Sequence, residues 1–232
     1  MRIQRWCLPA CLLLMTTIHA AEETKVVPVY EEPYHRLVFQ MNDMRVFNTS
    51  IPAGDTSHFH RHENPTLYVV LNYSLMRNQN LGEEWTSPDP DRSPPPGALL
   101  FRNYAEELQE HRVDNIGTES FQVIGVINYT AGGEGSAGIA DEAKFSNQWF
   151  DAYHYRLEPG KSSTGHNHDN PVIVVQVGEG RSHVLVDGRR SAAKTVKGNW
   201  SWHEAGVGHR LLNSGETDVE LVEIEVLLPS EK

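Results

Sequence analysis

The chain has 232 residues, of which 39% are hydrophobic, and a formal net charge of −11 at pH 7. This hydrophobic share is ordinary for a globular chain, and no segment approaches the roughly 20 consecutive apolar residues of a membrane helix. An acidic surface of this kind repels phosphate backbones and anionic membranes, which excludes nucleic acid and lipid surfaces as expected partners.

The first twenty residues are predicted to be an export signal that is removed. Arg2 and Arg5 precede a short apolar stretch, and Ala20 offers a small residue for cleavage. Both cysteines, Cys7 and Cys11, lie in this segment, so we expect a mature chain without disulfides or thiolate ligands. Removal leaves 18 basic residues against 31 acidic ones, a formal charge of −13. The sequence therefore predicts a soluble, secreted or periplasmic protein.

Beyond this segment, short apolar or alternating runs separated by Gly, Pro or Asp recur along the chain and predict strands. In chain order, clear examples are YHRLVFQ at 34–40, FQVIGVINY at 121–129, VIVVQV at 172–177, SHVLVDG at 182–188 and VELVEIEVLL at 219–228. Asp187-Gly188 predicts a tight hairpin turn. The sequence pattern shows little helical periodicity, so the expected fold class is all-β.

Two polar segments interrupt these runs and divide the chain. Residues 81–97 read as a proline-rich loop, and residues 131–147, rich in small side chains, read as a linker. We therefore expect an N-terminal domain at 30–130 and a C-terminal domain at 148–230.

The two halves repeat two motifs in the same order. FHRHENPTLYVVL begins at Phe59 and GHNHDNPVIVVQV begins at Gly165; each contains two histidines one residue apart, an acidic residue, Asn-Pro and an apolar run. Farther on, EHRVDNIGTESFQVIGV in the first half aligns with GHRLLNSGETDVELVEI in the second, which pairs His111 with His209. Two motifs repeated in matching order indicate an internal duplication.

The duplicated histidines predict two metal sites. Successive side chains on a strand point to opposite faces, so the two histidines of each pair share one face, and a third from a neighbouring strand completes each set. Neutral imidazole suits Fe, Zn, Cu, Ni or Co, whereas Mg and Ca prefer other ligands. Three protein ligands leave coordination positions open for water, oxygen or substrate. The predicted ligands are His60, His62 and His111 in the first half and His166, His168 and His209 in the second.

This order of residues resembles the two motifs of the cupin superfamily, and their duplication resembles a bicupin. The likeness covers about residues 34–228, with Gly54 or Gly160 before each His-x-His pair and a later histidine followed by an asparagine. The resemblance implies two tandem barrels of double-stranded β-helix, or jelly-roll, type with about six to eight strands each. It also implies a metal held by histidines inside one mouth of each barrel.

The chain departs from the cupin pattern at one ligand. Metal-binding cupins such as germins and oxalate decarboxylases carry a glutamate four or five residues after the second histidine. Those positions hold Thr66 and Leu67 in the first half and Val172 and Ile173 in the second. The resemblance therefore implies a three-histidine type without the usual glutamate, similar to the thiol dioxygenase and diketone-cleaving branches.

Carboxylates and a further histidine beside these pairs are weaker candidates for the site. Glu63 and Asp169 are expected to face away from the histidines unless the strand bulges before Asn-Pro. His58 shares a face with His60 and is expected at the rim, with a ligand or proton-carrier role as the alternative.

In the second half, Trp200 and Trp202 share a strand face before His209. They either wall a pocket for a planar substrate or pack between the sheets or against the other barrel. Glu204 and His203 either transfer protons near that mouth or lie in an exposed loop. The remaining histidines His35, His154 and His183 carry no partner pattern and are expected to be ordinary strand histidines.

The first functional hypothesis is an exported, metal-dependent oxidoreductase of dioxygenase type. Fe(II), or alternatively Zn, Mn, Cu or Ni, would bind oxygen and a small organic substrate at its open positions. A metal-dependent lyase, isomerase or hydrolase and a non-catalytic protein that binds a metal or small ligand are the alternatives, because a cupin fold suits all three. A duplicated chain already contains a pseudo-dimer, so both a monomer and a homodimer remain open.

Overall fold

The computed structural model describes residues 25–137, 139 and 143–229. The predicted export signal lies outside these described residues. Within them strands predominate, and the only helical element is the short 3-10 turn η1 (Val29–Glu31). No helix in the described part of the chain is long and apolar enough to cross a membrane. The predicted all-β fold class is confirmed.

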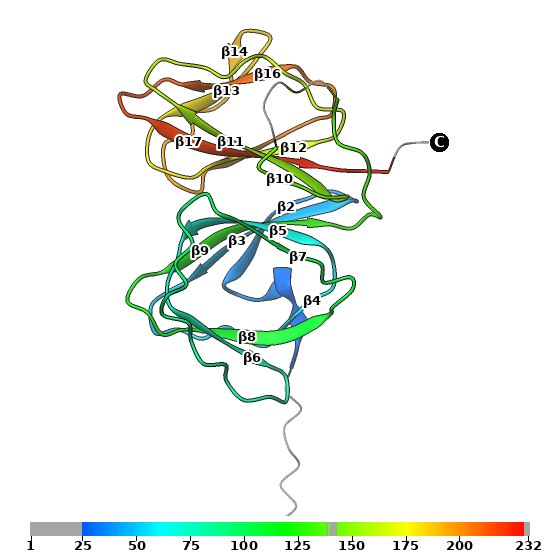
Figure 1. The fold of residues 1–232 in the computed structure, drawn as a ribbon, viewed down its shortest axis with the longest axis vertical. Coiled ribbons are helices and arrows are strands. Elements are labelled where there is room, and N and C mark those ends of the chain that lie inside the picture. Colours follow the sequence, from blue (N-terminus) through cyan, green and yellow to red (C-terminus); the bar gives the residue numbers. More distant parts are fainter. Residues whose placement is uncertain (1–24, 138, 140–142, 230–232) are drawn as a thin grey trace, which may run out of the picture.

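The N-terminal half folds into two sheets that enclose a barrel (Figure 1). Its strands are β1 (Val27–Pro28), β2 (His35–Gln40), β3 (Met44–Ile51), β4 (His60–His62), β5 (Thr66–Asn72), β6 (Met76–Asn80), β7 (Leu99–Arg102), β8 (Gln109–Asn115) and β9 (Phe121–Asn128). One sheet has the order β2-β3-β9-β5-β7, and the opposite sheet has the order β1-β4-β8-β6. The order within each sheet brings strands that are distant in sequence side by side.

The C-terminal half repeats this arrangement. Its strands are β10 (Phe145–Ser146), β11 (Phe150–Leu157), β12 (Val172–Gln176), β13 (Ser182–Val186), β14 (Arg189–Arg190), β15 (Trp200–His203), β16 (His209–Asn213) and β17 (Val219–Val226). They form a five-stranded sheet, β10-β11-β17-β12-β15, and a three-stranded sheet, β14-β13-β16. Asp187 and Gly188 both have positive φ, 50° and 74°, and join β13 to β14 in the predicted hairpin.

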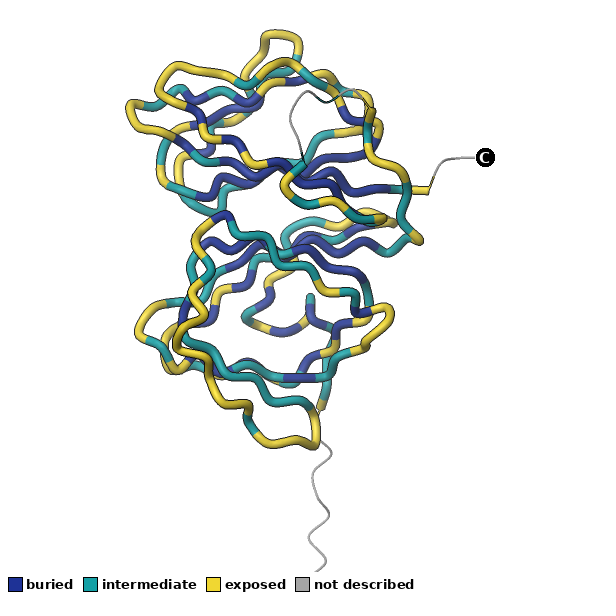
Figure 2. The backbone as a smooth tube through the Cα atoms, viewed as in Figure 1, coloured by how far each residue is buried: buried dark blue, intermediate teal, exposed yellow. Residues whose placement is uncertain are grey.

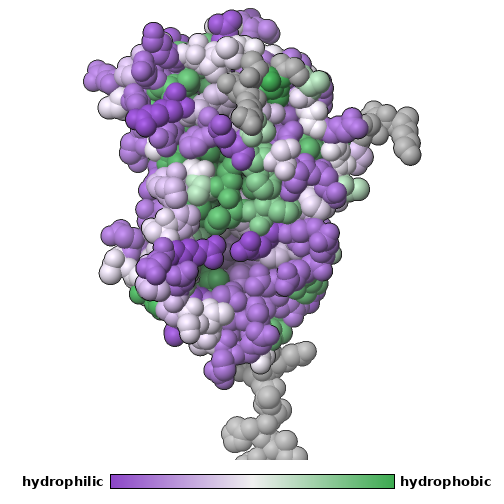
Figure 3. Space-filling model, viewed as in Figure 1, coloured by the Kyte–Doolittle hydropathy of each residue, from purple (hydrophilic) through white to green (hydrophobic). Residues whose placement is uncertain are grey.

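The two five-stranded sheets pack against each other and bury a core between the barrels (Figures 1 and 2). Each strand contributes alternate side chains to this core, as the period of two in a strand requires. The core includes Met44, Val46, Leu67, Val69, Leu71, Ile124 and Val126 from the first half and Phe150, Ala152, Ile173, Val175, Val177, Val222, Ile224 and Val226 from the second. We call this inter-barrel core the seam. On the face seen in Figure 3, hydrophobic side chains gather where the barrels meet.

The interiors of the two barrels are filled differently. The C-terminal interior holds a cluster of nine buried hydrophobic residues that includes Val174, Leu211 and Leu221. In the N-terminal half, the smaller cluster away from the seam has only Val29, Phe47 and Ile127 as buried members. A cavity of about 360 Å³ lies in the N-terminal barrel beside His60, His62 and His111. The first barrel therefore has room for a small molecule.

Candidate metal centres

The first candidate centre consists of His60 and His62 on β4 and His111 on β8. Antiparallel pairing places His60 directly opposite His111, and His62 shares the face of His60. One ring nitrogen from each histidine lies within 4.8 Å of the others. The ring centroids are 4.6 to 5.1 Å apart. The rings predicted to converge in the first half therefore do so.

Hydrogen bonds fix how these rings are turned. Nδ1 of His60 donates to the carbonyl of His58 at 2.9 Å, and Nδ1 of His111 contacts Oδ1 of Asn78. Nδ1 of His62 lies 3.3 Å from the hydroxyl of Tyr68. Among the described residues, the buried Nε2 atoms of His60 and His111 have no hydrogen-bond partner. Buried polar atoms are rarely left unpaired, and an Nδ1 that donates leaves Nε2 with a free lone pair, so this set fits a metal ion.

The three imidazole rings of the first centre carry no charge at neutral pH. Burial, followed by the charges of neighbouring histidines, lowers the pKa of His60 and His62 well below 6.5. Burial also lowers the pKa of His111 to about 3. All three rings are therefore neutral at pH 7, the form in which imidazole binds a metal.

His35, expected to be an ordinary strand histidine, lies against this centre. Its ring centroid is 4.4 Å from that of His60, and it lines the same cavity. Its Nδ1 lies 2.6 Å from the buried carboxylate of Glu32. Although burial opposes the shift, this contact with His35 lowers the pKa of Glu32. The buried carboxylate of Glu32 is therefore bound to His35.

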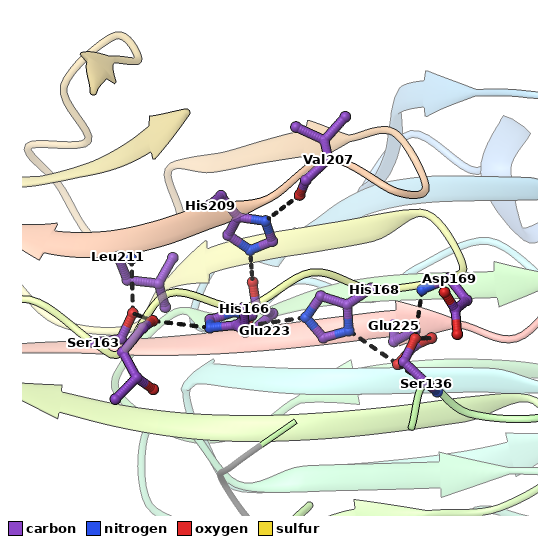
Figure 4. A network of polar contacts seen from close by, with 11 residues as sticks. Ser136, Ser163, His166, His168, Asp169, Val207, His209, Leu211, Glu223 and Glu225 are labelled. Carbon is purple, nitrogen blue, oxygen red and sulfur yellow. Dashed lines mark hydrogen bonds and ion pairs between the residues drawn. The ribbon is translucent and has the colours of Figure 1, made fainter. Parts of the chain in front are cut away.

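The second candidate centre contains four side chains rather than three (Figure 4). His166 and His209 face each other across an isolated antiparallel bridge, and His168 follows on the same segment. Glu223, on β17, points between the three rings. Its oxygens lie 2.9 Å from Nε2 of His166, 3.5 Å from Nε2 of His168 and 2.6 Å from Nε2 of His209. The predicted triplet of the second half thus converges on a buried carboxylate.

Each ring of the second centre is also held through Nδ1. His166 donates to the carbonyl of Thr164 at 3.1 Å, and His209 donates to that of Val207 at 2.9 Å. Nδ1 of His168 lies 2.9 Å from the carboxylate of Glu225. Such outer hydrogen bonds orient metal-binding histidines and set which nitrogen is free. All three Nε2 atoms face one point, so this set also fits a metal ion.

Glu225 is itself fixed by neighbouring polar groups. Its carboxylate accepts hydrogen bonds from the hydroxyl of Ser136 and, at 2.7 Å, from the side-chain amide of Asn170. Ser136 belongs to the segment predicted as a linker, and Asn170 is the asparagine of the repeated Asn-Pro. These contacts hold the carboxylate against His168.

Two buried carboxylates give the second centre an electrostatic character opposite to that of the first. Although burial opposes the shift, the contact with Glu223 raises the pKa of His166. Burial also lowers the pKa of His168, but the contacts with Glu223 and Glu225 outweigh it and raise this pKa to about 9. The pKa of Glu223 is held well below 4.5 by the histidines, against the effect of burial. The second centre is therefore a cluster of charged groups, whereas the first is neutral.

Comparison with known proteins shows which fold this architecture shares. No protein-family model and no curated protein sequence matches the chain. Among solved structures, it is similar to AerE from Microcystis aeruginosa, with a TM-score of 0.57 and 15% identity over 86% of this chain and 96% of that one. It is also similar to a cupin 2 conserved barrel domain protein from Leptotrichia buccalis, with a TM-score of 0.50 and 11% identity over 82% and 86% of the chains. The fold is that of the cupins.

A third cupin neighbour is an enzyme. Salicylate 1,2-dioxygenase from Pseudaminobacter salicylatoxidans aligns with a TM-score of 0.56 and 12% identity over 84% of this chain and 77% of that one. At these identities the likeness concerns the fold, and it agrees with the predicted pair of cupin barrels.

One expectation about the cupin ligands needs correction. The second half was expected to lack the usual glutamate, but Glu223 joins its histidines from another strand. The positions after the His-x-His pair, Val172 and Ile173, are indeed apolar, so a search confined to that motif misses the carboxylate. A usable signal was present, because Glu223 and Glu225 share one face of β17 with the apolar Val219 and Leu221.

The first half has no equivalent carboxylate because Gly125 aligns with Glu223. A Cβ at Gly125 would lie 2.2 Å from Cζ of Phe47, so the phenyl ring fills the space that a side chain there would need. A three-histidine set therefore describes the first cupin barrel and not the second.

The weaker acidic candidates lie away from both centres. The side chain of Glu63 is 52% exposed and pairs with Arg61. Asp169 and Glu204 are exposed. His58 is exposed too, and its carbonyl orients His60. The nearby acidic residues thus face solvent, as the period of two indicates for Glu63 and Asp169.

The two tryptophans lie on the seam side of β15. Trp200 and Trp202 pack with Phe39 of the first barrel, at centroid distances of 5.7 and 5.5 Å. Trp202 pairs with Ile173, which belongs to the seam, so both rings lie on the face opposite to Glu223. Packing against the other barrel is therefore the role that the structure gives them. His203 stacks on His209 at 5.5 Å and accordingly lies beside the second centre.

Proposed function

We propose that the protein is an exported bicupin that acts as a metal-dependent oxidoreductase of dioxygenase type on a small organic substrate. The observation that carries the proposal is the set of buried, neutral imidazoles in the first barrel. Two of them, His60 and His111, present unpaired Nε2 atoms beside a cavity of about 360 Å³. Unpaired nitrogen donors and room for a ligand are what an open metal site requires.

The proposed ligands of the first site are His60, His62 and His111. A divalent transition metal, Fe(II) in the favoured case and Zn, Mn, Cu or Ni otherwise, would supply Lewis acidity or redox chemistry there. Because the three ligands carry no charge, they leave the full positive charge of the ion available to an anionic substrate. The tyrosine pair Tyr68 and Tyr104, with hydroxyls 3.2 Å apart, orients His62 from behind.

The walls of this cavity favour a small, partly aromatic molecule. Tyr73, Leu100 and Phe121 line it together with Arg92 and Arg102. The apolar side chains exclude water, and the two arginines attract a negatively charged group. The neighbour salicylate 1,2-dioxygenase has been solved with gentisate bound, which supports the inclusion of hydroxybenzoates among the substrates to be tested.

The second site has its own proposed ligands, His166, His168, His209 and Glu223. Hydrophobic residues such as Val174 and Leu221 pack in the interior of this barrel, whereas the cavity of about 360 Å³ lies beside the first site. We assign oxygen chemistry to the first barrel and a tightly held metal to the second. Either one ion or two per chain is consistent with the fold.

Two other functions remain as candidates. A lyase, isomerase or hydrolase would use the same ligands with a redox-inert ion, and a binding protein would hold a metal or small ligand without turnover. Activity under anaerobic conditions with zinc would favour the first, and stoichiometric binding without reaction would favour the second. The secreted or periplasmic location and the choice between monomer and homodimer belong to the proposal as well.

Measuring both the metal content and the oxygen consumption of variants tests the proposal. We expect His60→Ala to lose about one metal equivalent and all oxygen uptake with phenolic, hydroxybenzoate, diketone and thiol substrates. His166→Ala should also lose a metal equivalent but keep part of the uptake. His154→Ala alters an exposed histidine outside both centres and serves as the matched control. Metal-loaded protein that consumes no oxygen with any of these substrates would refute the dioxygenase assignment.

A further inference from the structure

The five-stranded sheet supplies the wall of the first barrel's cavity that faces the histidines. β3 and β9 of this sheet lie on the opposite side of the barrel from β8, which carries the proposed ligand His111 (Figure 1). Residues of both sheets line the cavity, so a ligand in it lies between the metal centre and this wall. The side chains of the wall therefore help to decide which ligands fit beside the ion.

Thr49 is a polar residue in a part of this wall that is otherwise apolar. It lies directly opposite Val123 of β9, and Ile51 and Phe121 form the next such pair on the same face. All four residues line the cavity. On its other side Thr49 pairs with His35 of β2. The hydroxyl of Thr49 thus stands among apolar side chains, next to the histidine that lies against the first centre.

This hydroxyl is buried without a hydrogen bond. Thr49 is only 1% exposed, and within the described part of the chain its Oγ1 has no hydrogen-bond partner. Buried hydroxyls are normally paired, and an unpaired one costs free energy. The neighbouring polar groups are already paired, Nδ1 of His35 with Glu32 and the hydroxyl of Tyr68 with that of Tyr104. The hydroxyl of Thr49 is therefore available to a ligand.

A second threonine of the same sheet shows the ordinary arrangement. Thr66 is also 1% exposed, but its hydroxyl donates to the carbonyl of Asn64 at 2.9 Å. Thr66 lies outside the lining of the cavity, whereas Thr49 belongs to it. Of these two buried threonines, the one with the unpaired hydroxyl is the one that borders the cavity.

The positive charge of the cavity lies toward its other end. Arg102 pairs with Thr66, which pairs with Ile127 of β9, whereas Thr49 pairs with Val123 of the same strand. Val123 and Ile127 are four positions apart, which is about 13 Å along the strand. The long side chain of Arg102 covers part of this distance, so a molecule with one ring can reach both groups. An anionic group finds its counter-charge at Arg102 and not in the apolar surroundings of Thr49.

We propose that Thr49 determines the substrate specificity of this cavity by a hydrogen bond to a neutral hydroxyl group of the substrate. The substrate is then a small ring with an anionic group toward Arg102 and a hydroxyl at its opposite end. A substrate hydroxyl and the threonine hydroxyl can each donate or accept, so they can pair in either direction. The inference rests on the proposed function, because it takes this cavity as the substrate site, and it adds the class of substrate.

Calorimetric titration of 4-hydroxybenzoate and benzoate into the full chain tests this proposal. The two probes share a ring and a carboxylate and differ in one hydroxyl. We expect 4-hydroxybenzoate to bind more tightly by about fivefold or more, with and without added zinc. Thr49→Val replaces the hydroxyl by a methyl group of similar size, and it should remove the preference by weakening the binding of 4-hydroxybenzoate alone. Thr49→Ser keeps a hydroxyl and should keep the preference.

Thermal unfolding provides a readout that needs no ligand. Thr49→Val removes an unpaired hydroxyl, so it should unfold at the same temperature as the parent chain or a higher one. Thr66→Val is the matched control, because it removes a paired hydroxyl. It should unfold at a lower temperature and keep the preference for 4-hydroxybenzoate. If Thr49→Val does not fold, Thr49→Ser and Thr49→Ala decide the question, since they differ only in the hydroxyl.

The outcomes separate this inference from the dioxygenase assignment. Equal binding of the two probes by the parent chain, binding of neither, or a preference that Thr49→Val retains would overturn the inference. The dioxygenase assignment depends instead on oxygen uptake, and these titrations involve no turnover. A hydroxyl preference that depends on Thr49, found in a protein that consumes no oxygen, would support the substrate class and refute the reaction alone.

Discussion

Glu223 and Gly125 occupy equivalent positions in the duplicated halves and give the two centres different electrostatics. Glu223 contacts three histidines and makes the second centre a cluster of charges. At Gly125 the ring of Phe47 fills the space and leaves the first centre neutral. A metal ion would therefore keep its full charge in the first barrel and lose part of it in the second.

The close contact between Gly125 and Phe47 predicts a stability effect. Gly125→Ala would place a Cβ 2.2 Å from Cζ of Phe47, so we expect a loss of about 1 to 3 kcal/mol in the free energy of unfolding. Phe47→Leu in the same chain should restore part of the loss. Denaturant unfolding measures both effects. Gly178→Ala, where nothing lies within 4 Å of the added carbon, is the control, and equal stability of the two alanine variants would contradict the packing.

The imidazole pKa values predict that the two centres release different numbers of protons on binding metal. At pH 7 the ring of His111, with a pKa of about 3, is already neutral, whereas that of His168, with a pKa of about 9, carries a proton. Zinc titrated into metal-free His60→Ala, which keeps the second centre, should release at least about one proton per ion, because the pKa of His166 is raised as well. His166→Ala, which keeps the first, should release almost none. Calorimetry in buffers of different ionisation enthalpy measures the difference, and equal release would count against these environments.

At the scale of elements, the repeated asparagines hold the last turn of each barrel, where the chain passes from one sheet to the other. Asn213 donates to the carbonyls of Leu157 and Thr217 at 2.8 and 2.7 Å, and its Oδ1 accepts the amide of Gly215. Asn115 makes the same three bonds in the first barrel. Both side chains are fully buried. They therefore join the turn after β8 or β16 to the end of the neighbouring strand and do not bind metal.

Removal of such an asparagine should destabilise its barrel. Asn213→Ala removes both donors and leaves the buried carbonyl of Leu157 unpaired, so we expect a loss of about 2 to 4 kcal/mol in the free energy of unfolding. Asn167→Ala, at an exposed position between the two ligand histidines, should cost less than about 0.5 kcal/mol. Thermal and denaturant unfolding of the two variants compare them directly. A small effect at Asn213 would show that solvent replaces its hydrogen bonds.

The sequence was sufficient to predict strands, hairpin and histidine triplets, because each depends on short-range spacing. His60 and His62 lie one residue apart on a strand, and the duplication located His111. Glu223 was missed because the spacing along β17 shows only that Glu223 and Glu225 share a face, and the pairing of β17 with β11 and β12 decides which residues that face meets. The packing of Phe39 on Trp202 is likewise a contact between barrels, and only the folded chain decides it.

On the scale of the whole molecule, the seam and the second centre are the two faces of the same strand. Val222, Ile224 and Val226 of β17 lie in the seam, while Glu223 and Glu225 between them face the histidines. Since alternate residues of one strand are fixed relative to each other, packing at the seam also positions the carboxylates. The two barrels therefore should not unfold independently.

Phe150→Ala tests this coupling, because the ring is fully buried in the seam. The variant should lose about 3 to 5 kcal/mol, and its calorimetric trace should separate into two transitions where the parent chain shows one. Leu211→Ala, in the interior of the second barrel, should cost a similar amount, about 2 to 5 kcal/mol, without separating the transitions. The pair of variants isolates the seam from general destabilisation. If both lowered a single transition alike, the barrels would be joined by contacts other than this core, and the positioning of Glu223 would not depend on it.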